Sequence, residues 1–155
     1  MADGSPRRSR PGFEPGYGIS EDEEGMLDWS WAEERLERSR NYWIVTAGED
    51  GPAAAPVWGI WAGGALFFGT NPNSRKGRNL ERDPRVVVHL ESGDEVVILR
   101  GSIVHEDLPD AVVDAYEAKY DFRPQHTQGW FVLRPASAVA WLESEYPKTA
   151  TRFDF

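Results

Sequence analysis

Short strand-like segments separated by tight, glycine-containing turns constrain the fold of this chain more than any other feature. Runs such as 42–47 (YWIVTA) and 65–69 (ALFFG) are rich in β-branched and aromatic residues and end at turn residues. The expected strands cover residues 42–47, 54–61, 65–69, 85–91, 95–105, 130–133 and 138–142, and the expected helices cover 31–40, 75–82 and 109–120. Because the helices occur singly, without regular alternation with strands, the order predicts a mainly β protein: a small antiparallel barrel with a few short helices.

Two of the expected strands are apolar on both faces, in the runs Val86–Val88 and Val96–Leu99. Such strands need cover on both sides, as the wall of a barrel has when something packs outside it. A chain of 155 residues has little material for a complete second layer. Cover by a second copy of the chain, in a homodimer, is physically sensible for such strands.

Residues 1–25 differ in composition from the rest of the chain. They are rich in Gly, Pro and acidic residues and contain almost no aliphatic side chains. Such a segment cannot bury enough apolar surface to offset the conformational entropy lost when it becomes ordered. We expect a disordered N-terminal tail over residues 1–25 and one domain over residues 26–155.

The charge balance limits the partners of this chain. Lys and Arg number 17 against 26 Asp and Glu, which gives a formal net charge of -9. Nucleic acids and anionic membranes repel such a surface, so neither is an expected partner. The chain has no cysteine, and His89, His105 and His126 lack the spacing of metal ligands. With no apolar run of membrane-spanning length, this composition predicts a cytoplasmic protein without a bound metal.

One segment, Ser74–Arg85 (SRKGRNLERDPR), concentrates positive charge in this anionic chain. The segment predicts a short helix over residues 75–82, stopped before a proline. In a helix of this length Arg75, Arg78 and Arg82 share one stripe. The sequence therefore places three guanidinium groups along the same face.

The first turn of that helix is unusual because it carries Arg75 and Lys76. Cations oppose the helix dipole at this end unless an anion binds there. Backbone N–H groups, the Ser74 hydroxyl and the two cations together indicate a cradle for a phosphate. The alternative is a solvated basic face that pairs with Glu81 and Asp83.

The run 65–85 (ALFFGTNPNSRKGRNLERDPR) resembles a segment of the FMN-binding split-barrel family, the pyridoxamine 5′-phosphate oxidase-like proteins. In that family a strand ending in an aromatic residue and Thr leads to Ser-Arg-Lys, a short helix, and an Asn-Pro-Arg-Val or Asp-Pro-Arg-Val start of the next strand. The order of expected elements from Trp31 to Trp141 also matches. The resemblance implies a Greek-key-like antiparallel split barrel that dimerises and binds its cofactor at the subunit interface.

Position by position, the resemblance implies a set of cofactor-binding residues. Arg75 and Lys76 match the pair that grips the FMN phosphate, and two hydroxyl side chains match those near the ribityl–phosphate end. The strand 56–58 takes the place of the one that runs along the edge of the isoalloxazine ring. The complete set is Pro56, Val57, Trp58, Thr70, Ser74, Arg75, Lys76, Arg78 and Asn79. No side chain is identified as a catalytic acid or base.

Two departures separate this chain from authentic pyridoxamine phosphate oxidases. Those enzymes begin the ring-flanking strand with Arg and end it with Lys, whereas residues 54–59 (AAPVWG) contain neither. Their C-terminal Arg-x-His pair is also missing, since residues 151–154 read TRFD. More similar are the relatives that use FMN or the deazaflavin coenzyme F-420 and show K-x-x-N-L-x-x-D-P-R-V, which residues 76–86 reproduce.

The resemblance implies an FMN- or F-420-dependent oxidoreductase that transfers hydride to or from a small conjugated organic substrate. FMN is the first expectation, because the pair Arg75 and Lys76 suits a terminal dianionic phosphate. F-420 is the alternative, because its longer anionic tail suits a stripe continued by Arg78, Arg82 and Arg85. The competing class is a non-enzymatic flavin carrier or haem-binding module, in which a histidine would be the axial ligand.

Overall fold

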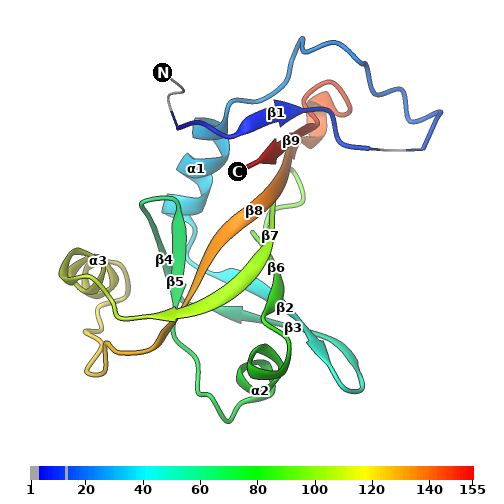
Figure 1. Cartoon of the computed structure of the whole chain (residues 1–155). Helices are drawn as coiled ribbons and strands as arrows, with labels where there is room; N and C mark the ends of the chain where they lie inside the picture. The colour runs from blue at the N-terminus through cyan, green and yellow to red at the C-terminus, as the bar shows by residue number, and fades with distance from the viewer. Residues whose placement is uncertain (1–3, 13) are drawn as a thin grey trace.

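The computed structural model describes residues 4–12 and 14–155 (Figure 1). Its nine strands form one antiparallel system in the order β1-β9-β8-β7-β6-β2-β3, with β4 and β5 attached through β8. The strands are β1 (Arg7–Ser9), β2 (Tyr42–Gly48), β3 (Gly51–Val57), β4 (Gly59–Ala62), β5 (Ala65–Phe68), β6 (Arg85–His89), β7 (Glu95–Glu106), β8 (Trp130–Leu142) and β9 (Thr151–Asp154). The helices are α1 (Trp29–Arg38), α2 (Arg75–Arg82) and α3 (Asp110–Tyr120), followed by a 3-10 turn over Glu143–Glu145. None of the helices in the described part of the chain is long and apolar enough to cross a lipid bilayer.

The barrel closes through residues 51–62, which pair with two different neighbours in turn. Over its whole length β3 pairs with β2. After Trp58 the chain continues as β4, which pairs with β5. Because β5 also pairs with β8, and β8 leads through β7 and β6 back to β2, the ring of strands is complete. The expected antiparallel split barrel is confirmed. At Trp58 the chain stops pairing with β2 and begins to pair with β5.

Alternating side chains of these strands fill the interior of the barrel, and α1 closes one end. Ala32 and Leu36 of α1 are fully buried against this core. On the outside, α3 covers β4 and β5 (Figure 1) and forms a second apolar cluster with them. The largest fully buried side chains of the barrel include Tyr42, Ile44, Leu66, Phe68, Val88, Leu99 and Leu133.

The two strands expected at 130–133 and 138–142 are one continuous strand, β8. The intervening Pro135 does not end the strand, because the register with β7 shifts between Arg100 and Gly101. A Cβ at Gly101 would lie 2.8 Å from Leu133 Cδ1, so the bulge depends on a residue without a side chain. The segment expected at 54–61 is likewise divided differently, into β3 and β4.

The expected disordered tail is wrong for residues 7–10. Strand β1 pairs antiparallel with β9. Directly after it, the Arg10 side chain is only 10% exposed and donates four hydrogen bonds to main-chain carbonyls. The composition of this segment indicated only that it lacks apolar surface. The pairing of β1 with β9 and the hydrogen bonds of Arg10 order it instead. The accepting carbonyls belong to Asp22, Glu24, Lys148 and Ala150, at 2.6 to 2.9 Å.

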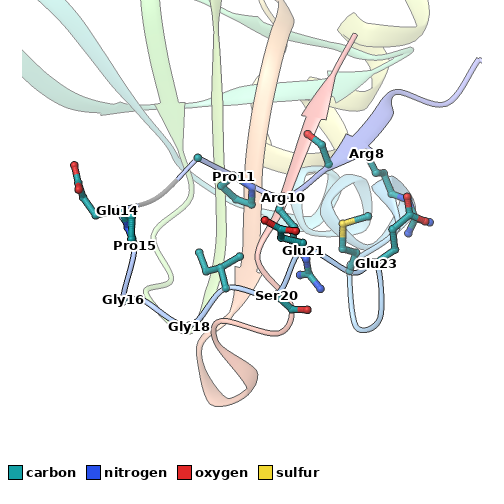
Figure 2. A pocket seen from close by; sticks show the side chains of 14 residues that line it. Arg8, Arg10, Pro11, Glu14, Pro15, Gly16, Gly18, Ser20, Glu21 and Glu23 are labelled. Carbon is teal, nitrogen blue, oxygen red and sulfur yellow. The ribbon is translucent and has the colours of Figure 1, made fainter.

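After Arg10 the chain runs away from the barrel and turns back past Ser20 to Glu21 and Glu23 (Figure 1 and Figure 2). It borders a hollow of about 760 Å³, which is lined by residues between 8 and 26. Among the described residues, the lining comes from β1 and the segment that follows it, and none comes from β2 to β9. The hollow is therefore a feature of the N-terminal segment, separate from the candidate site described below.

Replacing Arg10 with Met should lower the free energy of unfolding by about 2 kcal/mol, because several charge-assisted hydrogen bonds are lost together. Urea denaturation followed by circular dichroism measures this change. The matched control is Arg7→Met, since the Arg7 side chain is 75% exposed and pairs only at the surface with Asp154. The control should change stability by less than about 0.5 kcal/mol. Equal losses in the two variants would contradict the anchoring role of Arg10.

Candidate functional site

The loop before α2 and the first turn of α2 are held together by their own hydrogen bonds. Ser74 Oγ accepts the N–H of Gly77 at 3.1 Å and donates to the Asn71 carbonyl at 2.6 Å. Thr70 Oγ1 lies 3.3 Å from Ser74 Oγ. A Cβ at Gly77 would lie 2.5 Å from the Asn71 carbonyl oxygen, so glycine permits the loop to pack on the helix. The Ser74 hydroxyl oxygen caps the helix, and its proton is donated to the Asn71 carbonyl within the loop.

A cavity of about 300 Å³ separates α2 from the turn between β2 and β3. Arg75, Arg78 and Arg82 all line it, which confirms that they share one stripe. The opposite wall consists of residues 48–53. Arg82 is held at the edge of the cavity, where it pairs with Glu49 at 3.1 Å and donates to a main-chain carbonyl of β2 at 2.8 Å. Arg75 and Arg78 are the guanidinium groups left to meet a ligand.

Most cationic side chains of this chain have a carboxylate within 4.0 Å, but those of the first turn of α2 do not. Unpaired cations are unfavourable at a helix N-terminus unless an anion binds there. The first turn of α2 therefore offers both charge and open space to a phosphate. Within residues 4–12 and 14–155, the cations without such a partner are Arg40, Arg75, Lys76, Arg78, Arg100 and Lys119.

The expected site residues around α2 have different surroundings. Asn79 lines the cavity but is buried, and its Nδ2 donates to Thr46 Oγ1 at 3.0 Å, which ties α2 to β2. Arg78 also donates to the Asn73 carbonyl. The expected residues of this region that do not line the cavity are Thr70, Ser74 and Lys76.

The expected ring-flanking residues lie at the end of β3, an edge strand of the sheet. Their side chains alternate: Pro56 and Trp58 are exposed, whereas Val57 is buried in the barrel core. A ligand outside the barrel can therefore meet only the main chain of Val57. Earlier in β3, three successive alanines at 53–55 present only small side chains, and in the described part of the chain no strand pairs with the free edge of β3.

A second group of side chains surrounds the point where β3 gives way to β4. The Tyr120 hydroxyl accepts the N–H of Gly59 at 2.9 Å and donates to the Arg40 carbonyl at 2.7 Å. Lys119 Nζ donates to the Gly59 carbonyl and to the Tyr42 hydroxyl, both at 3.0 Å. Burial, assisted by the nearby Arg40 charge, lowers the pKa of Lys119 to about 8.

Sequence reasoning missed this second group. Tyr120 and Lys119 lie at the end of the expected helix over residues 109–120, and neither gave a separate signal. Nothing in the sequence relates Arg40, two residues after the end of α1, to Trp58, eighteen positions later. The barrel topology brings these residues together.

Two of the three histidines, His89 and His105, are engaged in other contacts. The ring nitrogens of His105 lie 2.9 Å from Glu81 Oε1 and 3.1 Å from the Gly129 carbonyl. His89 stacks on Trp43 and hydrogen bonds through Nδ1 to a neighbouring carbonyl. Over the described ranges no group of three or more His, Asp or Glu side chains is arranged to hold a metal ion.

A sequence profile described as pyridoxamine 5′-phosphate oxidase matches residues 30–142, from α1 to the end of β8. The chain belongs to this family. The match confirms the resemblance carried by the Ser-Arg-Lys and Asp-Pro-Arg-Val motifs. No curated protein matches the sequence.

Several solved structures share the fold of this pyridoxamine 5′-phosphate oxidase-like protein. A conserved hypothetical protein, Rv2991 from Mycobacterium tuberculosis, is 21% identical with a TM-score of 0.65, covering 77% of this chain and 88% of that chain. A structure named F420 Reductase is 21% identical with a TM-score of 0.50, covering 79% of this chain and 92% of its own. A heme binding protein from Mycobacterium smegmatis is 20% identical with a TM-score of 0.60, covering 81% of this chain and 57% of its own. At such identities the likeness concerns the fold alone.

Proposed function

We propose that this protein is an FMN-dependent oxidoreductase that transfers hydride to or from a small conjugated organic substrate. The observation that carries the proposal is the group of unpaired cations in the first turn of α2, beside an open cavity, in a member of this family. Arg75 and Arg78 would hold the phosphate, with Lys76 adding positive charge. The open edge of β3, toward Pro56, would flank the ring. The bound cofactor would supply the redox chemistry, and the protein would bind and orient the cofactor.

The ion pairs around α2 favour FMN over F-420. A cofactor with a long anionic tail would use the cations beyond Arg78. However, Arg82 is paired with Glu49, and Arg85 donates two hydrogen bonds to Asp83, at 2.9 and 2.6 Å. These hydrogen bonds lower the pKa of Asp83 to about 2, so its carboxylate remains charged and occupied. The α2 cations without a carboxylate partner, Arg75, Lys76 and Arg78, form a compact group, which suits a terminal phosphate. F-420 remains the alternative cofactor, in line with the similarity to the structure named F420 Reductase.

We further propose that the protein acts as a homodimer with the cofactor at the subunit interface. On the outer face of β2, β6 and β7, the apolar side chains of Trp43, Val45, Val87 and Ile98 are only half-buried. Trp43 also stacks on His89 there, with the two rings parallel and their centres 6.1 Å apart. This face supports the dimer because a second copy would complete the cover that the two-sided strands need.

Replacing Arg75 and Lys76 together with Ala should weaken FMN binding by about a hundredfold, since two charge-assisted contacts are lost. Fluorescence titration of FMN measures the affinity, and the same titration with F-420 compares the two cofactors. The control is the double variant Arg7→Ala and Arg134→Ala, which removes the same charge from exposed ion pairs. Unchanged affinity in the Arg75 and Lys76 variant would refute the site.

The reduced cofactor should be reoxidised by a conjugated acceptor such as menadione, while pyridoxine 5′-phosphate is not turned over. The reason is that the chain lacks the Arg, Lys and His that clamp a second phosphate in authentic pyridoxamine phosphate oxidases. Anaerobic bleaching or recovery of the flavin absorbance measures both reactions. Pyridoxine phosphate oxidation with stoichiometric hydrogen peroxide would overturn the substrate proposal. A Soret band in the purified protein would support the haem-binding alternative instead.

Size-exclusion chromatography with light scattering should give the mass of a dimer. Val87→Glu should shift the protein to a monomer with weaker FMN binding, because it places a charge on the half-buried outer face. Val104→Glu is the matched control, since Val104 is 49% exposed. A wild-type monomer that binds FMN fully would argue against an interface site.

A further inference from the structure

The point where β3 gives way to β4 carries a stacking surface outside the α2 cavity. The rings of Trp58 and Tyr120 are parallel within 7°, with their centres 4.6 Å apart. Tyr120 therefore covers one face of the indole. Trp58 is nevertheless 40% exposed, a high value for a tryptophan in a stack.

Arg40 lies beside this stack rather than on top of it. Its guanidinium carbon is 5.5 Å from the centre of the Trp58 ring and 5.4 Å from the centre of the Tyr120 ring. A group covering the outer face of the indole would be much farther from Tyr120 than from Trp58. Arg40 therefore leaves the outer face of the indole uncovered and places a cation at the edge of the ring.

The charge around the stack is positive and uncompensated. Neither Arg40 nor Lys119 has a carboxylate within 4.0 Å in the described part of the chain. Burial raises the pKa of both Tyr42 and Tyr120, so these hydroxyls are neutral near pH 7. Glu37, three residues before Arg40, acts electrostatically on Tyr42 and raises its pKa further, but it forms no ion pair with Arg40. An anion bound here would relieve the repulsion between the two cations.

The surface is also fixed before any ligand arrives. Hydrogen bonds from Tyr120 and Lys119 hold the main chain of Gly59, next to Trp58. The Tyr120 hydroxyl also donates to the main chain of Arg40. The main chain that carries Trp58 and Arg40 is therefore ordered before binding, which reduces the conformational entropy lost when a ligand binds.

We propose that the open face of Trp58, with Arg40 at its edge, binds a planar conjugated ligand that carries a carboxylate. The flat ring would stack on the indole, and the carboxylate would accept hydrogen bonds from the guanidinium group. An aliphatic acid lacks the flat face, and an aromatic amide lacks the charge. Identification of this ligand as the substrate rests on the proposed oxidoreductase function, because Trp58 follows the strand that would flank the cofactor ring. The binding surface itself does not depend on that function.

The test uses three probes with the full-length protein: 2-naphthoate, 2-naphthamide and cyclohexanecarboxylate. Saturation-transfer NMR titrations give their affinities. We expect 2-naphthoate to bind at least about tenfold more tightly than either other probe, and added NaCl to weaken only the charged probes. Arg40→Gln should weaken 2-naphthoate binding about tenfold, as expected for one charge-assisted hydrogen bond. Trp58→Leu should weaken binding of both naphthalene probes.

The control is Arg123→Gln, which removes the same charge from an exposed pair with Asp114 and Glu117 and should leave naphthoate affinity unchanged. Arg40 is exposed, so its variant should fold, which the melting temperature verifies. No binding of 2-naphthoate to the wild type, or equal binding to Arg40→Gln, would overturn the proposal.

A comparison with FMN binding separates this proposal from the proposed function. Arg40→Gln should leave FMN affinity unchanged, and the Arg75 and Lys76 double variant should keep its affinity for 2-naphthoate. Loss of naphthoate binding in the double variant would contradict a separate surface at Trp58. Failure of the wild type to bind FMN or F-420, with naphthoate binding intact, would reject the cofactor assignment alone.

Discussion

The hydrogen bonds between the end of α3 and Gly59 are the interaction on which the barrel depends. At Gly59 the chain leaves the ladder with β2 and joins the ladder with β5. The Tyr120 hydroxyl and the Lys119 ammonium group satisfy the Gly59 peptide groups at this change of partner. A Cβ at Gly59 would lie 2.9 Å from the Phe67 carbonyl oxygen, so no other residue fits there without a shift. Tyr120 belongs to the apolar cluster under α3, which holds the end of this helix against β4. The hydrogen bonds to Gly59 thus both support closure of the ring of strands and fix the position of Trp58.

The positive charges of this anionic protein serve two different purposes. Many are paired and hold elements together, as Arg35 of α1 does with Glu95 of β7 at 2.7 Å. Others are left without a carboxylate although acidic residues are abundant in the chain. Apart from Arg100 on the sheet, these gather in the first turn of α2 and beside the stack of Trp58. In both places no carboxylate of the described chain supplies the missing negative charge, which is why we propose an anionic ligand for each.

Local signals in the sequence were enough to predict α2 and the stripe along it. Ser74 caps this helix and Pro84 follows its end, so both boundaries could be read directly. The sequence could not show that Pro135 lies inside one long strand, because the bulge that permits it forms with a strand far away in the chain. Nor could composition reveal β1, since its order comes from main-chain pairing. Arg40 and Lys119 escaped prediction because they come together around Trp58 and Gly59 only when the barrel has closed.

The pairing of β1 with β9 sets a constraint on how the chain reaches its folded state. Arg7 and Asp154, which bond to each other, are 147 positions apart in the sequence. Contacts between such distant residues close large loops and form late in folding. During synthesis, β1 therefore remains unpaired until nearly all of the barrel has left the ribosome. Its short length and its two arginines make it a poor template for pairing with other chains during that interval. The residues of β1, whose composition is unsuited to a core, are thus suited to remaining soluble until β9 is available for pairing.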